Sequence, residues 1–183
     1  MYAYSQINPT SATPEIIKAW KSISSFLESS DTNTRTSAST ALSKVAQSFS
    51  AELIAQKNSP VQKIVAQVGT ALESVAYARA IPEVLSVITA LVWNLRHRAS
   101  KTGPTAAEQL LIPLIKRISE LRIQKTFEYK EAADVTLGMA MHVMGPHVVL
   151  EALPLNLEPG TRKPGEEPKA FLLPLLSQSH PSP

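Results

Sequence analysis

Residues 81–95 read Ile-Pro-Glu-Val-Leu-Ser-Val-Ile-Thr-Ala-Leu-Val-Trp-Asn-Leu, and this stretch decides the fold class. Its apolar residues recur at intervals of three and four, which is the period of a helix and not the alternation of a strand. Apolar side chains cover almost the whole circumference, so a helix that begins at Ile81 needs cover on more than one face. A central position in a layered helical structure provides that cover.

The same period extends to both sides of this stretch. Five further segments carry an apolar stripe with helical spacing, over about 14–29, 38–49, 60–75, 105–121 and 130–144. Pro113 is expected to kink the fifth of the six helices or to start its second half. Helix pairs begin near positions 14, 61 and 105, a period typical of HEAT and armadillo repeats. We therefore expect an all-α fold, a HEAT/armadillo-type α-α superhelix of about three helix pairs, with a four-helix bundle as the alternative.

The composition changes after Gly145-Pro146, which ends one helix and permits a short new one. Seven of the fourteen prolines lie in the last thirty residues, so regular helices cannot continue unbroken there. We predict HEAT-like helical repeats over 1–153, an exposed and mobile Pro/Gly-rich loop over 154–169, and a short apolar helix with a truncated tail over 170–183. All three belong to one solenoid segment. A solenoid normally ends in a polar cap, so we also expect this chain to be cut from something longer.

Composition and charge exclude several classes of protein. The chain has 183 residues, 44% of them hydrophobic, and a net charge of +3, which suits one globular domain. The absence of cysteine excludes disulfides, thiolate nucleophiles and cysteine-ligated zinc. The start of the chain lacks the pattern of a signal peptide, and the most apolar run, Val84 to Trp93, is about half as long as a membrane helix. We expect a soluble intracellular protein that does not enter a membrane.

Motifs for catalysis or cofactor binding are missing. The sequence contains no glycine-rich phosphate-binding motif, no His-Glu-x-x-His and no Gly-x-Ser-x-Gly. His142 and His147 are the nearest approach to a metal pair, but Gly145-Pro146 breaks the helix between them. The three methionines between positions 139 and 144 are typical core residues. We therefore expect no enzyme, no cofactor, no metal and no small-molecule substrate.

Basic residues gather in the middle of the chain. Residues 96–130 contain eight basic and three acidic side chains, a local charge of +5, whereas the remainder carries −2. Several of these cations follow helix ends, where the helix dipole favours them without any partner. In a solenoid, equivalent turns align, so the same cations can also form a ridge that follows a phosphate backbone. The candidate residues for binding RNA or an acidic partner are Arg96, Arg98, Lys101, Lys116, Arg117, Arg122 and Lys125. Neither Trp20 nor Trp93 lies in a basic cluster that looks exposed, so base stacking is not expected.

The last third of the sequence resembles a known family. Met144-Gly145-Pro146 is followed by Val148-Val149-Leu150-Glu151, by Leu153-Pro154-Leu155-Asn156-Leu157, by a Pro-rich loop and by Ala170-Phe171-Leu172-Leu173-Pro174-Leu175. This ordered series closely resembles a signature of the ribosomal RNA-processing protein 12 family, which comprises large nucleolar HEAT-repeat proteins. The upstream helices are also similar to that family's central repeats. Family members usually have Gly-Arg and a tryptophan around the final motif, where this chain has Pro168-Lys169-Ala170-Phe171.

The resemblance implies a function in ribosome biogenesis. It implies a non-catalytic scaffold that acts in pre-rRNA processing, small-subunit assembly and pre-ribosome export, located in the nucleus and nucleolus. The implied partners are proteins of the pre-ribosomal particle, pre-rRNA and nuclear transport factors. In the family, further repeats pack on the last helix, so the apolar residues between 171 and 176 are expected to be partly uncovered here. The alternative function is a karyopherin-like or armadillo-type protein adaptor that binds no RNA.

Overall fold

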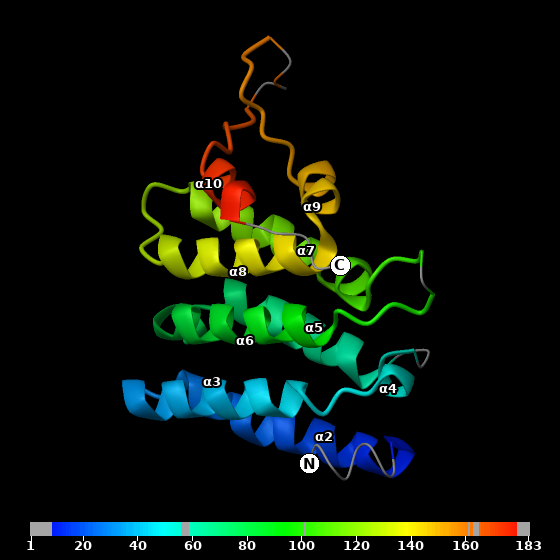
Figure 1. Cartoon of the computed structure of the whole chain (residues 1–183). Coiled ribbons are helices and arrows are strands. Elements are labelled where there is room, and N and C mark those ends of the chain that lie inside the picture. Colours follow the sequence, from blue (N-terminus) through cyan, green and yellow to red (C-terminus); the bar gives the residue numbers. More distant parts are fainter. Residues whose placement is uncertain (1–8, 56–58, 101, 161, 163–164, 179–183) are drawn as a thin grey trace. The chain divides into compact units, whose positions relative to one another are not determined.

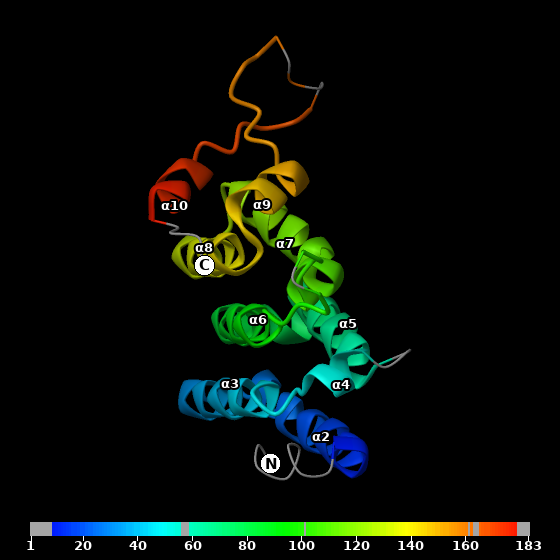
Figure 2. The same cartoon turned by 45° about the vertical axis from the view of Figure 1, so that its right-hand side comes forward.

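The computed structural model describes residues 9–55, 59–100, 102–160, 162 and 165–178, with the side chains of 9–13 and 52 left out. The chain divides into two compact units, Met1–His97 and Arg98–Pro183. The described residues form helices joined by turns and loops (Figures 1 and 2), with no strand among them and one isolated antiparallel bridge between Arg98 and Thr105. The expected all-α class is confirmed.

The first unit is built from two layers of helices. Its elements are α2 (Pro9–Ser24), the 3₁₀ turn η1 (Ser25–Glu28), α3 (Thr32–Ala46), α4 (Ala51–Ala55), α5 (Pro60–Glu73), the 3₁₀ turn η2 (Val75–Ala80) and α6 (Ile81–Asn94). Helix α3 packs along α6 and against α2, and α5 packs on α6 and α2 (Figure 1). The apolar residues of α6 are buried on several sides, as its sequence predicts: Val84, Leu85, Val87, Ile88, Leu91 and Val92.

Helix boundaries in this unit differ from the expected ones at three places. Helix α2 begins at Pro9 and contains Pro14, whereas the sequence suggested a start at Pro14. Helix α3 begins at Thr32, six residues before the expected segment 38–49, because the Asp31 carboxylate accepts the Thr34 backbone N–H at 2.8 Å and caps the helix. The expected second helix ran to Phe49, but α3 ends at Ala46 and the short α4 follows.

One segment of this unit, Val75–Asn94, is long and apolar enough to cross a membrane by length and composition. It spans η2 and α6 and has 20 residues, so it is longer than the apolar run Val84 to Trp93 from which we expected no membrane helix. Half of the segment is buried inside the protein, where α6 packs against α3. The core helix of a water-soluble domain has these same properties.

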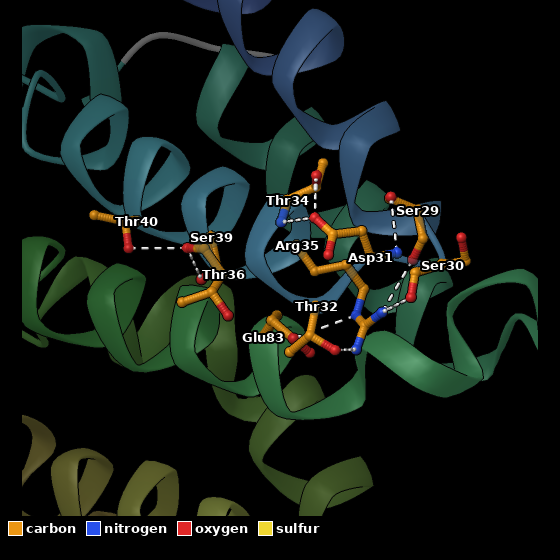
Figure 3. A network of polar contacts seen from close by, with 10 residues as sticks. All are labelled: Ser29, Ser30, Asp31, Thr32, Thr34, Arg35, Thr36, Ser39, Thr40 and Glu83. Atoms are coloured by element: carbon orange, nitrogen blue, oxygen red, sulfur yellow. Dashed lines mark hydrogen bonds and ion pairs between the residues drawn. The ribbon is translucent and has the colours of Figure 1, made fainter.

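A buried ion pair connects α3 to α6 (Figure 3). Arg35 Nε lies 3.3 Å from Glu83 Oε1, and the two side chains are 9% and 10% exposed. The same guanidinium donates to the carbonyls of Ser29 and Ser30 at 3.0 and 3.1 Å and to Thr32 Oγ1 at 3.1 Å. Arg35 therefore also holds the turn that leads into α3, and its charge is compensated by several oxygens.

The second unit is centred on α8. Its elements are α7 (Ala106–Ile123), α8 (Lys130–Met144), α9 (Pro146–Ala152) and α10 (Leu172–Gln178). Helix α8 packs against α7, α9 and α10 (Figure 2). Helix α7 is continuous from Ala106 to Ile123, so Pro113 lies inside it and does not begin a separate helix. Pro113 lies on the exposed side of α7, where water can bond the carbonyl that proline leaves without a donor.

The chain between α9 and α10 forms a loop whose two ends meet. The Lys169 backbone N–H donates to the Leu155 carbonyl at 2.8 Å and closes the loop at its base. Inside the loop, Arg162 Nε donates to the Asn156 carbonyl at 3.0 Å, and the Asn156 amide donates to Glu166 Oε2 at 2.8 Å. The described part of 154–169 contains no helix or strand, and its side chains are mostly exposed. The tail residues 179–183 lie outside the described residues.

Candidate nucleic-acid interface

The candidate basic residues are divided between the two units. Arg96 belongs to the first unit and follows α6, whereas Arg98, Lys116, Arg117, Arg122 and Lys125 belong to the second. Lys101 lies outside the described residues. Four candidates are exposed, namely Arg96, Arg98, Lys116 and Lys125.

Helix α7 positions the candidates of the second unit. Thr105 caps the helix through a capping box, in which Thr105 Oγ1 accepts the Glu108 N–H and Glu108 Oε1 accepts the Thr105 N–H. The buried stripe of α7 consists of Leu111, Leu114, Ile115 and Ile118. Lys116 therefore falls on the opposite, exposed face, as helical spacing requires.

Three further cations lie on α7 or in the loops that flank it. Arg98 lies in the loop before the helix and donates to the Gly103 carbonyl at 2.8 Å. Arg117 follows Lys116 and forms a partly exposed ion pair with Glu120 at 3.0 Å. Lys125 lies in the loop after the helix. We call Arg98, Lys116, Arg117 and Lys125 the α7 basic series, which extends from the loop before this 18-residue helix to the loop after it.

Arg122 differs from the other candidates because a carboxylate on a different helix accepts two hydrogen bonds from it. Its Nε and Nη2 donate to the two carboxylate oxygens of Asp134 on α8, at 2.7 and 3.0 Å. Its guanidinium carbon lies 4.8 Å from the centre of the Phe171 ring, just before α10. A bidentate pair of this kind is stronger and more specific than a simple ion pair. Arg122 therefore ties α7, α8 and the start of α10 together.

The structure places one aromatic residue where the sequence analysis did not expect it. Trp20 is buried, with 1% of its surface exposed, but Trp93 is 42% exposed. The guanidinium carbon of Arg96 lies 4.7 Å from the centre of the Trp93 ring. We expected neither tryptophan to lie in a basic cluster that looks exposed; Trp93 is nevertheless exposed and lies against the exposed Arg96. The i, i+3 spacing of Trp93 and Arg96 at a helix end was the available signal.

A groove runs between α8 and α10 in the second unit. It has a volume of about 440 Å³ and combines apolar with polar side chains. The lining residues are Glu131, Asp134, Val135, Gly138, Met139 and His142 of α8 and Leu175 and Gln178 of α10. Val135 is 63% exposed, so apolar surface from α8 reaches solvent here.

Metal ligands do not converge in the part of the chain that the structure describes. No group of three or more His, Asp or Glu side chains is arranged to hold a metal ion there. His142 lines the groove, whereas His147 is exposed beyond the end of α8. The polar clusters around Arg35 and Arg122 contain ion pairs that join helices.

The sequence matches a family of known proteins. The family model described as "Ribosomal RNA-processing protein 12, HEAT repeats" matches residues 28–182. A Schizosaccharomyces pombe relative named for ribosomal RNA-processing protein 12 is 26% identical over 174 residues, which is 95% of this chain and 14% of that protein. Ribosomal RNA-processing protein 12 of Saccharomyces cerevisiae is 28% identical over 104 residues, which is 56% of this chain and 8% of that protein.

A human relative is also similar over a shorter stretch. The RRP12-like protein of Homo sapiens is 31% identical over 70 residues, which is 38% of this chain and 5% of that protein. The chain thus spans only a small part of each relative's length. No solved structure matches the chain. Because the family model covers most of the sequence, this chain belongs to the HEAT-repeat family of ribosomal RNA-processing protein 12, as its C-terminal signature suggested, and its fold is of the HEAT type.

Proposed function

We propose that this chain is a non-catalytic scaffold segment of a ribosome-biogenesis factor. In this role it acts in pre-rRNA processing, small-subunit assembly and pre-ribosome export in the nucleus and nucleolus. Its partners are proteins of the pre-ribosomal particle, precursor ribosomal RNA and nuclear transport factors. The observation that carries the proposal is the family match over residues 28–182. The names of the yeast relatives refer to ribosomal RNA processing, which supports the same role.

The RNA contact of the second unit is assigned to the α7 basic series, and Arg96 is a separate candidate cation of the first unit. Arg98, Lys116 and Lys125 are exposed, so phosphate groups reach them without any change in the fold. Phosphate contacts supply most of the sequence-independent affinity for RNA. Arg122 is left out of the RNA contact, because its Nε and Nη2 already donate to the two carboxylate oxygens of Asp134.

Charge reversal tests this assignment. Lys116, Arg117 and Lys125 are changed together to Glu, while Arg122 stays in place so that the α7–α8 ion pair is kept. The matched control reverses Lys18, Lys44 and Lys63, which are exposed on the first unit and change the net charge by the same amount. Binding of a labelled precursor ribosomal RNA fragment is measured by fluorescence anisotropy over a range of salt concentrations.

The proposal expects two results from this comparison. The α7 variant binds at least about tenfold more weakly at low salt, and the slope of log K against log salt falls by about 0.7 for each lost phosphate contact. The control variant binds nearly as tightly as the wild type. Equal losses in both variants would show that only total charge matters, and unchanged binding in the α7 variant would remove the series from the RNA contact.

The scaffold role is tested in cells with the whole gene product that contains this stretch. The tagged protein is expected to localise to the nucleolus. It is also expected to sediment with precursor ribosomal RNA in large particles, and RNase treatment is expected to release it from them. Sedimentation in light complexes without precursor RNA would contradict the role in ribosome assembly.

A protein adaptor without RNA binding is the second candidate function. The observation that favours it is the groove between α8 and α10, where Val135, Met139 and Leu175 offer apolar contacts to a peptide. Apolar contacts depend little on ionic strength, whereas phosphate contacts weaken steeply with salt. The salt series above therefore separates the two functions.

A further inference from the structure

The C-terminal end of α6 presents a tryptophan to solvent. Trp93 is the last residue but one of α6 and is 42% exposed, whereas its neighbours Leu91 and Val92 are fully buried. Leu95, which follows the helix, is also fully buried and donates its N–H to the Leu91 carbonyl at 2.9 Å. Core residues on both sides therefore fix the backbone that carries Trp93.

Arg96 is fixed against the same residue by two contacts. Its guanidinium carbon lies 4.7 Å from the centre of the Trp93 ring, within the range of a cation–π interaction. Its Nη1 also donates to the Trp93 carbonyl at 2.9 Å. Arg96 and the next residue, His97, are exposed. The end of α6 thus holds a planar cation and an indole ring in contact, at the surface and in a defined geometry.

Helix capping explains only part of this arrangement. A cation near a helix C-terminus is favoured by the helix dipole and by hydrogen bonds to the last carbonyls, and Arg96 makes such a bond. Capping requires no exposed aromatic ring. Tryptophan is the best partner for a guanidinium and an effective platform for a nucleobase, because its large ring stacks on every base. The first unit buries its other tryptophan, Trp20, completely.

We infer that Trp93 and Arg96 form a stacking site for an unpaired base of RNA, in which the base stacks on this aromatic–cationic pair and the Arg96 charge attracts the adjoining phosphate. This inference rests on the proposed contact with precursor ribosomal RNA, and it adds that the first unit binds single-stranded RNA. Bases in a duplex are stacked on their neighbours and are not available to the ring, so the site selects single-stranded RNA.

The two tryptophans give a direct readout of the site. Trp20 is buried, so a single-stranded oligouridylate is expected to quench mainly the Trp93 fluorescence of the intact chain. A duplex RNA of the same length is expected to leave the fluorescence nearly unchanged. Trp93→Leu is expected to abolish the quenching and to weaken single-strand binding about tenfold, as the loss of one stacked base does, with little effect on duplex binding.

Three variants separate stacking from other effects. Trp93→Phe keeps an aromatic ring and is expected to recover part of the single-strand affinity, whereas Arg96→Lys keeps the charge but loses the planar group and is expected to recover little. Phe26→Leu is the matched control, because Phe26 is also an exposed aromatic of the first unit and is 56% exposed. This control is expected to bind single strands as the wild type does.

Three other results would each contradict the stacking site. Wild-type affinity of Trp93→Leu for single strands would overturn it while leaving the general RNA contact intact. An equal loss of single-strand and duplex binding in Trp93→Leu would assign a purely structural role to Trp93. If the wild type binds neither single-stranded nor duplex RNA, the proposed RNA contact fails, and the stacking site fails with it.

Discussion

Replacing Arg35 with Met should destabilise the first unit more than replacing Arg35 with Met and Glu83 with Leu together. Glu83 is 10% exposed, and Arg35 Nε provides the hydrogen bond to its Oε1. The other carboxylate oxygen, Oε2, is buried without a hydrogen-bond partner among the described residues. The single substitution therefore leaves an uncompensated carboxylate beside α3. The double substitution removes both charges.

The expected magnitudes follow from these contacts. Removing one partner of a buried ion pair costs about 3–5 kcal/mol, because the other charge stays buried. That cost includes the loss of the bonds from Arg35 to the carbonyls of Ser29 and Ser30, worth about 1 kcal/mol each, which the double variant loses as well. The double variant loses little more than these bonds to the turn carbonyls, about 1–2 kcal/mol. The free energy of unfolding should thus be about 2 kcal/mol higher in the double variant than in the single variant.

Urea unfolding followed by tryptophan fluorescence measures this difference. Both tryptophans, Trp20 and Trp93, lie in the first unit, so the signal reports on that unit. With a slope of about 2 kcal/mol per molar urea, Arg35→Met should lower the midpoint by about 1.5–2.5 M. Lys44→Met is the control, since Lys44 is exposed on α3 and its replacement should change stability by less than about 0.5 kcal/mol.

Two results would refute this reasoning. If the single and double variants lose the same stability, the loss comes from the turn carbonyls or from packing and not from a buried charge. If Arg35→Met unfolds within about 0.5 kcal/mol of the wild type, the ion pair contributes no more than a surface pair does.

Three further predictions concern helix termini and helix contacts. Hydrogen bonds from the Thr34 side chain and backbone lower the pKa of Asp31 below its ordinary value of 3.8. The stabilisation from Asp31 is therefore present above pH 3.8 and is lost as the pH falls through the lowered pKa. Asp31→Ala should remove this part of the pH dependence of the urea midpoint. Arg122→Lys should cost about 1–2 kcal/mol, because lysine cannot form the bidentate pair with Asp134, and hydrogen exchange should show less protection in α10. Gly145 has a φ of 94°, and a Cβ there would lie 3.2 Å from the His147 ring. Gly145→Ala should therefore destabilise the protein by about 1 kcal/mol or more. Circular dichroism should show a melting temperature that is lower by several degrees.

The sequence predicted best the helices whose boundaries coincide with strong local signals. Helix α8 was expected over 130–144 and occupies Lys130–Met144, because its apolar period stops at the Gly-Pro pair that follows. The start of α3 was missed because Asp31, its N-cap, lies among polar residues that also suit a turn. The five-residue α4 was missed because it is too short to show a period.

The candidate interface was only partly visible in the sequence. The exposure of Lys116 follows from its position opposite the apolar stripe of α7. The partners of Arg122 could not be read in this way, because Asp134 and Phe171 are brought to it by packing between separate helices. The exposure of Trp93 was hidden because α6 is apolar almost all round, so periodicity does not show which residue at its end faces solvent.

The bond between Leu155 and Lys169 makes the loop between α9 and α10 tolerant of added length. Since the base of the loop is already closed, the positions of the helices on either side do not depend on the number of residues between Leu155 and Lys169. The entropic cost of a longer closed loop grows only with the logarithm of its length, about 0.6 kcal/mol for each doubling. Residues near Glu158 to Gly160, which are exposed, are therefore a suitable place to insert a peptide tag or a fluorescent reporter without displacing α10.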